Sequence, residues 1–135
     1  MLGVGMAAGS KQRQSDDRVV IDTIVGDVAG KDVIILDDEI ATAGSVVELL
    51  EAVRRYGVRS ISVACTHGLF TGRAIERLQA EPDITEIVTT NTVPPPVGLP
   101  NLTVASVAPL FAEAVKRINC GESVSSLFSD ERTYG

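Results

Sequence analysis

The sequence predicts an α/β fold with a mostly parallel sheet flanked by helices. Runs rich in β-branched residues alternate with segments of helical spacing, which is the order expected for such a sheet. Residues 32–36 (DVIIL) form a short, continuous apolar run after turn-forming glycines, as in a central strand buried on both faces. The length of 135 residues suits one domain over residues 1–135.

The start of the chain is less regular. Residues 1–10 are small, Gly-rich and apolar, and they fit either a short strand or an irregular segment. Residues 11–18 (KQRQSDDR) are polar and charged, so we expect a loop there. Residues 18–25 are rich in β-branched side chains and predict a strand. Gly26 and Gly30 then mark a turn before the next strand.

A loop at residues 37–45 leads into the first predicted helix. The apolar side chains of this helix recur at helical spacing and form one stripe, made of Val46, Leu49, Leu50 and Val53. Arg54 and Arg55 fall in the last turn, where cations suit the helix dipole, and Gly57 fits the position just after the helix.

The second half of the chain continues the alternation of strands and helices. The remaining predicted strands cover residues 59–66, 84–90 and 102–105, and the remaining helices cover residues 72–80 and 107–118. Pro82 stops the first of these helices, and the three prolines at 94–96 force an extended connection.

Composition excludes several classes of function. The formal net charge of −6 disfavours nucleic-acid binding, because Lys and Arg carry that contact. No apolar run approaches the roughly 20 residues that span a bilayer. The N-terminus lacks the basic region of a signal peptide, so we expect a cytoplasmic protein. Cys65 and Cys120 make no metal or disulfide pattern and are expected to be buried or half-buried thiols.

The chemistry is expected at the loop that follows the apolar run. Asp37 and Asp38 stand at the carboxyl end of a predicted parallel strand, where α/β sheets bind ligands. Two carboxylates there accept hydrogen bonds from a vicinal diol or face a cation. The next small and hydroxyl residues, Thr42, Ala43, Gly44 and Ser45, open a helix. Their backbone amides, their hydroxyls and the helix dipole favour an anion. One loop therefore offers groups for both ends of a sugar phosphate.

Structural explanations compete with this interpretation. An Asp-Asp pair after a strand is often a solvated turn, and a Thr-x-Gly-Ser run is often only a helix cap. The segment is not a Walker A loop, since it lacks the Gly-Lys-Ser/Thr ending. The single His67 is more often a hydrogen-bonded structural residue than a base, and we assign it no catalytic role.

The loop resembles the ribose-phosphate-binding loop of type I phosphoribosyltransferases and of the ribose-phosphate diphosphokinases that share their fold. Further stretches resemble the C-terminal half of the diphosphokinases in particular, namely residues 25–31 (VGDVAGK), 64–72 (ACTHGLFTG), 99–102 (LPNL) and 122–128 (ESVSSLF). The similarity covers residues 11–128, which is nearly the whole chain.

The resemblance implies a role for each matching residue. Asp37 and Asp38 would contact the ribose hydroxyls, and residues 42–45 would hold the 5-phosphate. Lys11 and Arg13 match the Lys-x-Arg pair of the family's mobile catalytic loop. In that family, Mg²⁺ assists as the anomeric hydroxyl of ribose 5-phosphate attacks the β-phosphorus of ATP, and AMP leaves. Charge develops on phosphoryl oxygens in the transition state, where closing cations stabilise it.

The sequence also departs from the family. Ala41 stands where the family usually has Asp, and Glu39 is expected to point elsewhere rather than to replace it. The family's N-terminal half, with much of the ATP site, has no counterpart here, and residues 1–10 do not match its diphosphate-binding loop. We therefore expect the sheet to lack the first strands of the full domain and to expose an edge that invites association.

These observations leave three hypotheses. The first is a ribose-phosphate diphosphokinase, whole or truncated, which binds ribose 5-phosphate and ATP and forms a homo-oligomer or joins a full-length subunit. The second is a non-catalytic or regulatory subunit that binds ribose 5-phosphate, which Ala41 and the missing half favour. The third and weakest is a nucleobase phosphoribosyltransferase. The sequence does not fix the metal ligands.

Overall fold

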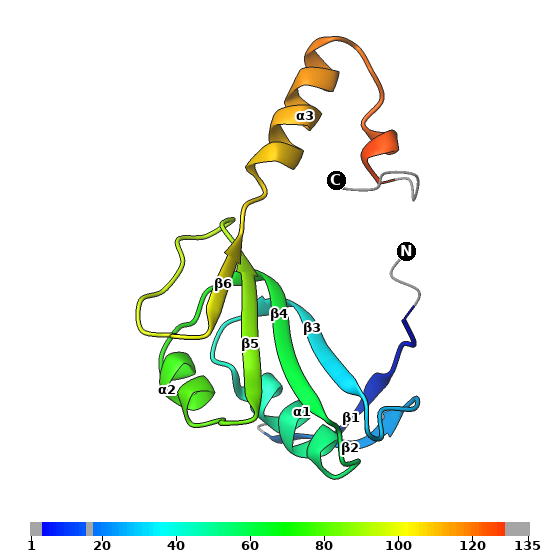
Figure 1. Ribbon diagram of the computed structural model, residues 1–135, viewed down its shortest axis with the longest axis vertical. Coiled ribbons are helices and arrows are strands. Elements are labelled where there is room, and N and C mark those ends of the chain that lie inside the picture. The colour runs from blue at the N-terminus through cyan, green and yellow to red at the C-terminus, as the bar shows by residue number, and fades with distance from the viewer. Residues whose placement is uncertain (1–3, 16–17, 129–135) are drawn as a thin grey trace. The chain divides into compact units, whose positions relative to one another are not determined.

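The structure is a computed structural model that describes residues 4–15 and 18–128 (Figure 1). The described residues form two compact units, which are treated separately. The sheet unit covers Val4–Ala105, and the C-terminal unit covers the described residues from Ser106 onwards. Because the two units are not placed relative to each other, the expectation of one domain over residues 1–135 stays a prediction.

A parallel sheet of four strands, in the order β3-β4-β5-β6, forms the centre of the sheet unit (Figure 1). Two helices follow strands of this sheet and connect them. The strands are β3 (Asp32–Ile40), β4 (Ser60–Gly68), β5 (Ile84–Thr90) and β6 (Leu102–Ala105), and the helices are α1 (Gly44–Arg54) and α2 (Ala74–Gln79). The predicted α/β class is therefore confirmed, and each of these elements lies where the sequence places it to within four residues.

The core lies between one face of the sheet and the helices. The stripe of α1 predicted from the sequence is mostly buried, with Leu50 fully so. It belongs to one apolar cluster with side chains of three strands, including Ile35, Val63 and Ile87. Burial of each such side chain stabilises the fold by about 1.5–3 kcal/mol relative to leaving it in water. This packing holds α1 under the sheet and thereby fixes where the helix begins.

Strand β3 differs from its prediction in two ways. It continues through Asp37 and Asp38 to Ile40, so those residues belong to the strand and not to a loop. It also lies at the edge of the sheet, and Ile34 and Leu36 are 67% and 78% exposed. The expectation of a central strand buried on both faces is therefore wrong for this unit. Within Val4–Ala105, the helices cover only the face that carries Ile35.

An antiparallel hairpin precedes the sheet. Its strands are β1 (Ala8–Ser15) and β2 (Arg18–Val25), so the loop predicted for residues 11–18 is wrong along most of its length. Polar residues form a strand here because the β-branched β2 offers a ladder of backbone groups for pairing. The hydroxyl of Tyr56, just after α1, accepts a hydrogen bond from the Ile24 amide at 3.2 Å.

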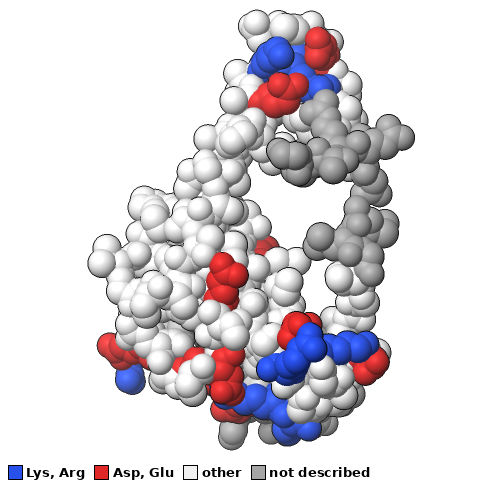
Figure 2. All heavy atoms as spheres, viewed as in Figure 1, with Lys and Arg blue, Asp and Glu red and all other residues white. Residues whose placement is uncertain are grey.

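Ion pairs gather at the end of the sheet where the strands begin (Figure 2). Arg54 contacts Glu81 and Asp83, each at 2.6 Å, and so joins α1 to the segment before β5. Arg59 and the Ser60 hydroxyl donate to Asp32, which holds the pKa of that carboxyl well below its usual range. A cavity of about 430 Å³ lies beside these groups, but its cations are already paired with carboxylates, so we assign it a structural role.

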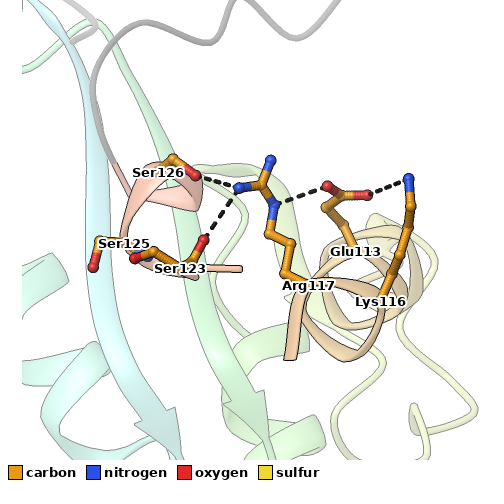
Figure 3. A network of polar contacts seen from close by, with 6 residues as sticks. All are labelled: Glu113, Lys116, Arg117, Ser123, Ser125 and Ser126. Carbon is orange, nitrogen blue, oxygen red and sulfur yellow. Dashed lines mark hydrogen bonds and ion pairs between the residues drawn. The ribbon is translucent and has the colours of Figure 1, made fainter. Parts of the chain in front are cut away.

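The C-terminal unit contains α3 (Ala108–Asn119) and the 3-10 turn η1 (Ser125–Leu127), which one arginine ties together (Figure 3). Arg117 donates to Glu113 on α3 at 2.8 Å, to the Ser123 carbonyl at 3.1 Å and to the Ser126 hydroxyl at 2.5 Å. The hydrogen bonds of this one guanidinium thus join the chain after α3 to the helix.

None of the helices within residues 4–15 and 18–128 has the length and apolar character needed to cross a bilayer.

Candidate sugar-phosphate site

A small cavity lies at the carboxyl end of β3, where the sequence predicts the ligand. Its volume is about 130 Å³, and it is lined by Asp37, Glu39 and the continuous run from Ile40 to Val46. The loop between β3 and α1 thus wraps around the cavity, and its four predicted phosphate-binding residues, 42–45, all line it. The structure therefore brings one predicted carboxylate and the predicted anion-binding turn together.

The turn has strained backbone. Among the described residues, Ala43 (φ 60°) and Phe70 (φ 43°) are the non-glycine residues with positive φ. Such a conformation costs about 1–2 kcal/mol for an L-residue, so packing must hold it in place. Ala43 is 4% exposed, and Phe70 is 6% exposed, which satisfies that requirement. Strain of this kind gathers at ligand-binding turns, and here both strained residues belong to the loop or to the segment packed against it.

The segment after β4 fixes the orientation of the loop. The amide of Phe70 donates to the Ile40 carbonyl at 3.0 Å, and the amide of Thr71 donates to the Ala41 carbonyl at 2.8 Å. In a planar trans peptide, the N–H points opposite to the C=O. The amides of Ala41 and Thr42 therefore point away from the segment that anchors the loop.

The first turn of α1 adds further amides. The first helical hydrogen bond runs from Val47 to the Ala43 carbonyl at 3.1 Å, so the amides of Gly44, Ser45 and Val46 find no acceptor within the helix. No acidic side chain occupies this first turn. All three residues line the cavity, where the positive end of the helix dipole favours an anion.

The carboxylates divide between two positions. Asp37 lines the cavity, and its Oδ1 accepts a hydrogen bond from the Asp38 amide at 2.9 Å. Asp38 itself is exposed and does not line the cavity, because successive side chains of a strand point to opposite faces. Glu39 does line it, contrary to our expectation that it points elsewhere. The sequence analysis gives the two aspartates the same role, because it does not predict that β3 continues past them to Ile40.

Ala41 also lines the cavity, and it offers no carboxylate there. Position 41 therefore contributes no acidic side chain to the cavity wall.

His67 lies on β4 directly beside Glu39 of β3 in the strand register. Its Nδ1 contacts the Thr92 hydroxyl at 2.9 Å, and Thr92 donates to the Thr66 carbonyl at 3.0 Å. This agrees with a hydrogen-bonded histidine, and we give it no further role. Nearby, Cys65 donates to Thr89 at 3.4 Å, and burial raises the pKa of its thiol.

The predicted catalytic pair is only partly visible. Lys11 and Arg13 lie on β1, opposite Ile21 and Val19 of β2. Their side chains fall outside the described part of the structure. Among residues 4–15 and 18–128, no three His, Cys, Asp or Glu side chains gather closely enough to hold a metal ion by themselves.

Comparison with known proteins places the chain in a family. The family model described as the phosphoribosyl synthetase-associated domain matches residues 11–129. A Streptomyces coelicolor protein named "Putative ribose-phosphate pyrophosphokinase" is 56% identical over 137 aligned positions, which cover 100% of this chain and 43% of that protein. The ribose-phosphate pyrophosphokinase of Campylobacter jejuni is 41% identical, over 94% of this chain and 41% of its own length.

A solved structure agrees with both relatives. The crystal structure of phosphoribosylpyrophosphate synthetase from Mycobacterium smegmatis superimposes with a TM-score of 0.67 and 34% sequence identity, over 79% of this chain and 35% of that one. The chain thus spans about two fifths of the length of the curated relatives that it matches. The resemblance stated from the sequence motifs is confirmed: the chain belongs to the ribose-phosphate pyrophosphokinase family and carries its phosphoribosyl synthetase-associated domain.

Proposed function

We propose that the cavity binds ribose 5-phosphate, with the sugar at Asp37 and the phosphate at residues 42–45. One observation carries this proposal: a carboxylate and a turn of outward-facing amides line the same small cavity. The carboxylate accepts hydrogen bonds from two neighbouring hydroxyls, and the amides donate to phosphoryl oxygens. Asp38 supports this arrangement by donating its amide to Asp37. Glu39, on the same wall, provides a second carboxylate for the sugar.

The reaction that we propose for this site is the one that the names of the relatives describe. Transfer of diphosphate from ATP to ribose 5-phosphate forms a bond between the anomeric oxygen and the β-phosphorus and breaks the bond to the α-phosphate oxygen, so that AMP leaves. In this chain, the cavity would hold the accepting sugar still. Lys11 and Arg13 would stabilise the charge that develops on the phosphoryl oxygens. ATP would need groups beyond this chain, because the chain covers only two fifths of its relatives.

The reaction also calls for Mg²⁺, which usually takes one or two carboxylates together with phosphates of the substrate. Asp37 and Glu39 would supply these one or two carboxylates, since both line the cavity. No group of three or more potential ligand side chains is found among the described residues. When bound, the ion would neutralise phosphoryl charge.

A second function is favoured by Ala41. Because the cavity wall carries no acid at this position, the chain would bind ribose 5-phosphate without turning it over, as a subunit that assembles with a catalytic partner. Assembly into a homo-oligomer, or with a longer relative, belongs to either function.

Matched single substitutions test the site. We expect Asp37→Asn to weaken ribose 5-phosphate binding, measured by calorimetric titration, by about tenfold or more, because a charged acceptor is lost. Asp38→Asn changes the neighbouring residue in the same way, but outside the cavity, and we expect it to change the affinity less than about threefold. Equal losses in the two variants, or no binding by the wild type, would contradict the proposed site.

Turnover separates the two functions. The chain is incubated with ATP, Mg²⁺ and ribose 5-phosphate, first alone and then with a full-length pyrophosphokinase, and AMP is measured. AMP above the background of the partner alone supports the enzyme. Binding of ribose 5-phosphate without any added AMP supports the non-catalytic subunit.

A further inference from the structure

Arg77 of α2 makes a side-chain hydrogen bond to the backbone of the loop between β3 and α1. Its Nη1 donates to the Thr42 carbonyl at 2.8 Å. The same nitrogen lies against Gly44, where an added Cβ would stand 3.7 Å from it. Arg77 does not line the cavity, so its guanidinium sits behind the loop and not in front of it.

With this bond, three successive carbonyls of the backbone each accept a hydrogen bond. The carbonyls of Ile40, Ala41 and Thr42 accept hydrogen bonds in turn from Phe70, Thr71 and Arg77. The first two donors are backbone amides, which any sequence would supply, whereas the third depends on one side chain. The Thr42 carbonyl belongs to the peptide whose amide is that of Ala43, the strained residue with φ 60°. Holding that carbonyl therefore sets the plane of the peptide that turns the Ala43 amide toward the cavity side.

The positive charge of Arg77 also favours an anion at the loop. The carbonyl is the negative end of the peptide dipole, and a guanidinium bound to it partly neutralises that end. The guanidinium also lies close behind Gly44, the first residue of α1, where an anion would meet the helix dipole. A cation in the layer behind the loop favours a negative ligand in front of it.

We propose that Arg77 is a positioning residue for the sugar-phosphate site: it fixes the Thr42–Ala43 peptide so that the loop amides face an anion. This inference rests on the proposed function for its ligand, and it adds a residue outside the cavity that the sequence motifs do not single out.

The matched control is Arg73 on the same segment. Arg73 is exposed and pairs with Glu76 at 2.8 Å, one turn from Arg77, and no hydrogen bond from its side chain to the loop is found in the described part of the chain. The variants are Arg77→Met, which removes the donor, Arg77→Lys, which keeps a charged donor, and Arg73→Met. Each is compared with the wild type by titration with ribose 5-phosphate and with sulfate, and by hydrogen exchange of the Phe70 and Thr71 amides, which bond the loop carbonyls beside Thr42.

We expect Arg77→Met to weaken the binding of both anions by about tenfold and to speed exchange of the Phe70 and Thr71 amides by a similar factor, because a charged hydrogen bond that holds the loop is lost. Arg77→Lys should recover most of both losses, and Arg73→Met should match the wild type. The melting midpoint should change little in all three variants, which separates positioning from a general loss of structure.

Other outcomes overturn the inference. If the wild type binds and Arg77→Met binds equally well, Arg77 has no positioning role, while the proposed function stands. If Arg73→Met loses as much affinity as Arg77→Met, the loss of affinity comes from the lower positive charge of the protein and not from the lost contact with Thr42. If the wild type binds neither ribose 5-phosphate nor sulfate, the proposed function itself fails, and the positioning role falls with it.

Discussion

Single residues in the loop carry unusual requirements. Ala43 adopts a left-handed backbone conformation while it is nearly fully buried, so it can be neither large nor β-branched. Gly68, at the end of β4, meets a similar limit, because an added Cβ would stand 2.3 Å from the Phe70 ring and 2.5 Å from the Thr89 hydroxyl. Both positions shape the backbone around the cavity and need no side-chain chemistry of their own.

The strain at Ala43 gives a prediction. Ala43→Val puts a β-branched side chain into a left-handed, buried position, and we expect it to destabilise the chain by about 2 kcal/mol and to abolish sulfate and ribose 5-phosphate binding. Denaturant unfolding and calorimetric titration measure the two effects. Ala64→Val, on β4, outside the cavity and without positive φ, serves as the control. Unchanged affinity in Ala43→Val would mean that the loop shape is not needed for the anion.

The helices and inner strands show what the sequence predicts at the scale of elements. The stripe of α1 and the β-branched runs of β4 and β5 are decided by local periodicity, and all three were predicted correctly. The end of β3 was not, because Asp37 to Ile40 are polar or mixed, and they are strand only through pairing with β4. The hairpin strand β1 was missed for the same reason, since a polar segment pairs through its backbone.

The site was predicted to the same degree. Its place at the carboxyl end of β3 and the role of residues 42–45 as the wall of the cavity follow from the motif. The separation of Asp37 from Asp38, and the presence of Glu39 in the cavity, depend on which face of β3 each residue occupies. Arg77 was missed because it is 35 residues from Thr42 along the chain, and no local pattern signals that contact.

The tie between α3 and η1 gives a prediction at this scale. Arg117→Met removes donors to Glu113, Ser123 and Ser126 at once, and we expect amides of residues 121–128 to exchange at least about tenfold faster. Lys116→Met is the control, because the ion pair found for Lys116 in the described part of the chain is with Glu113, at 3.9 Å. Hydrogen exchange read by mass spectrometry distinguishes them. Equal protection in the two variants would show that η1 is held without Arg117.

At the scale of the whole molecule, the sheet carries exposed apolar surface that another chain could cover. Parallel sheets are usually covered on both faces, yet within Val4–Ala105 one face of β3 leaves Ile34 and Leu36 more than half exposed. Within the described residues, no strand pairs with the outer edge of β3. Exposed apolar surface beside an unpaired edge favours association of chains.

We therefore expect the chain to associate in a concentration-dependent way, as sedimentation equilibrium would measure. Leu36→Lys should weaken this association by about tenfold or more, because burial of a leucine is worth about 1.5–3 kcal/mol. Val97→Lys is the control, since Val97 is 93% exposed but lies outside the sheet. A wild-type chain that stays monomeric at every concentration would contradict the prediction.

The contact of Asp32 with Arg59 and Ser60 has a consequence at the far end of the strand. It lies at the start of the backbone ladder that holds β3 against β4 in one register, and side chains alternate faces with every residue. A slip of one place would exchange Asp37 for Asp38 at the wall of the cavity. Which aspartate lines the cavity therefore depends on strand pairing that extends to a contact about 17 Å away, five residues upstream and outside the cavity.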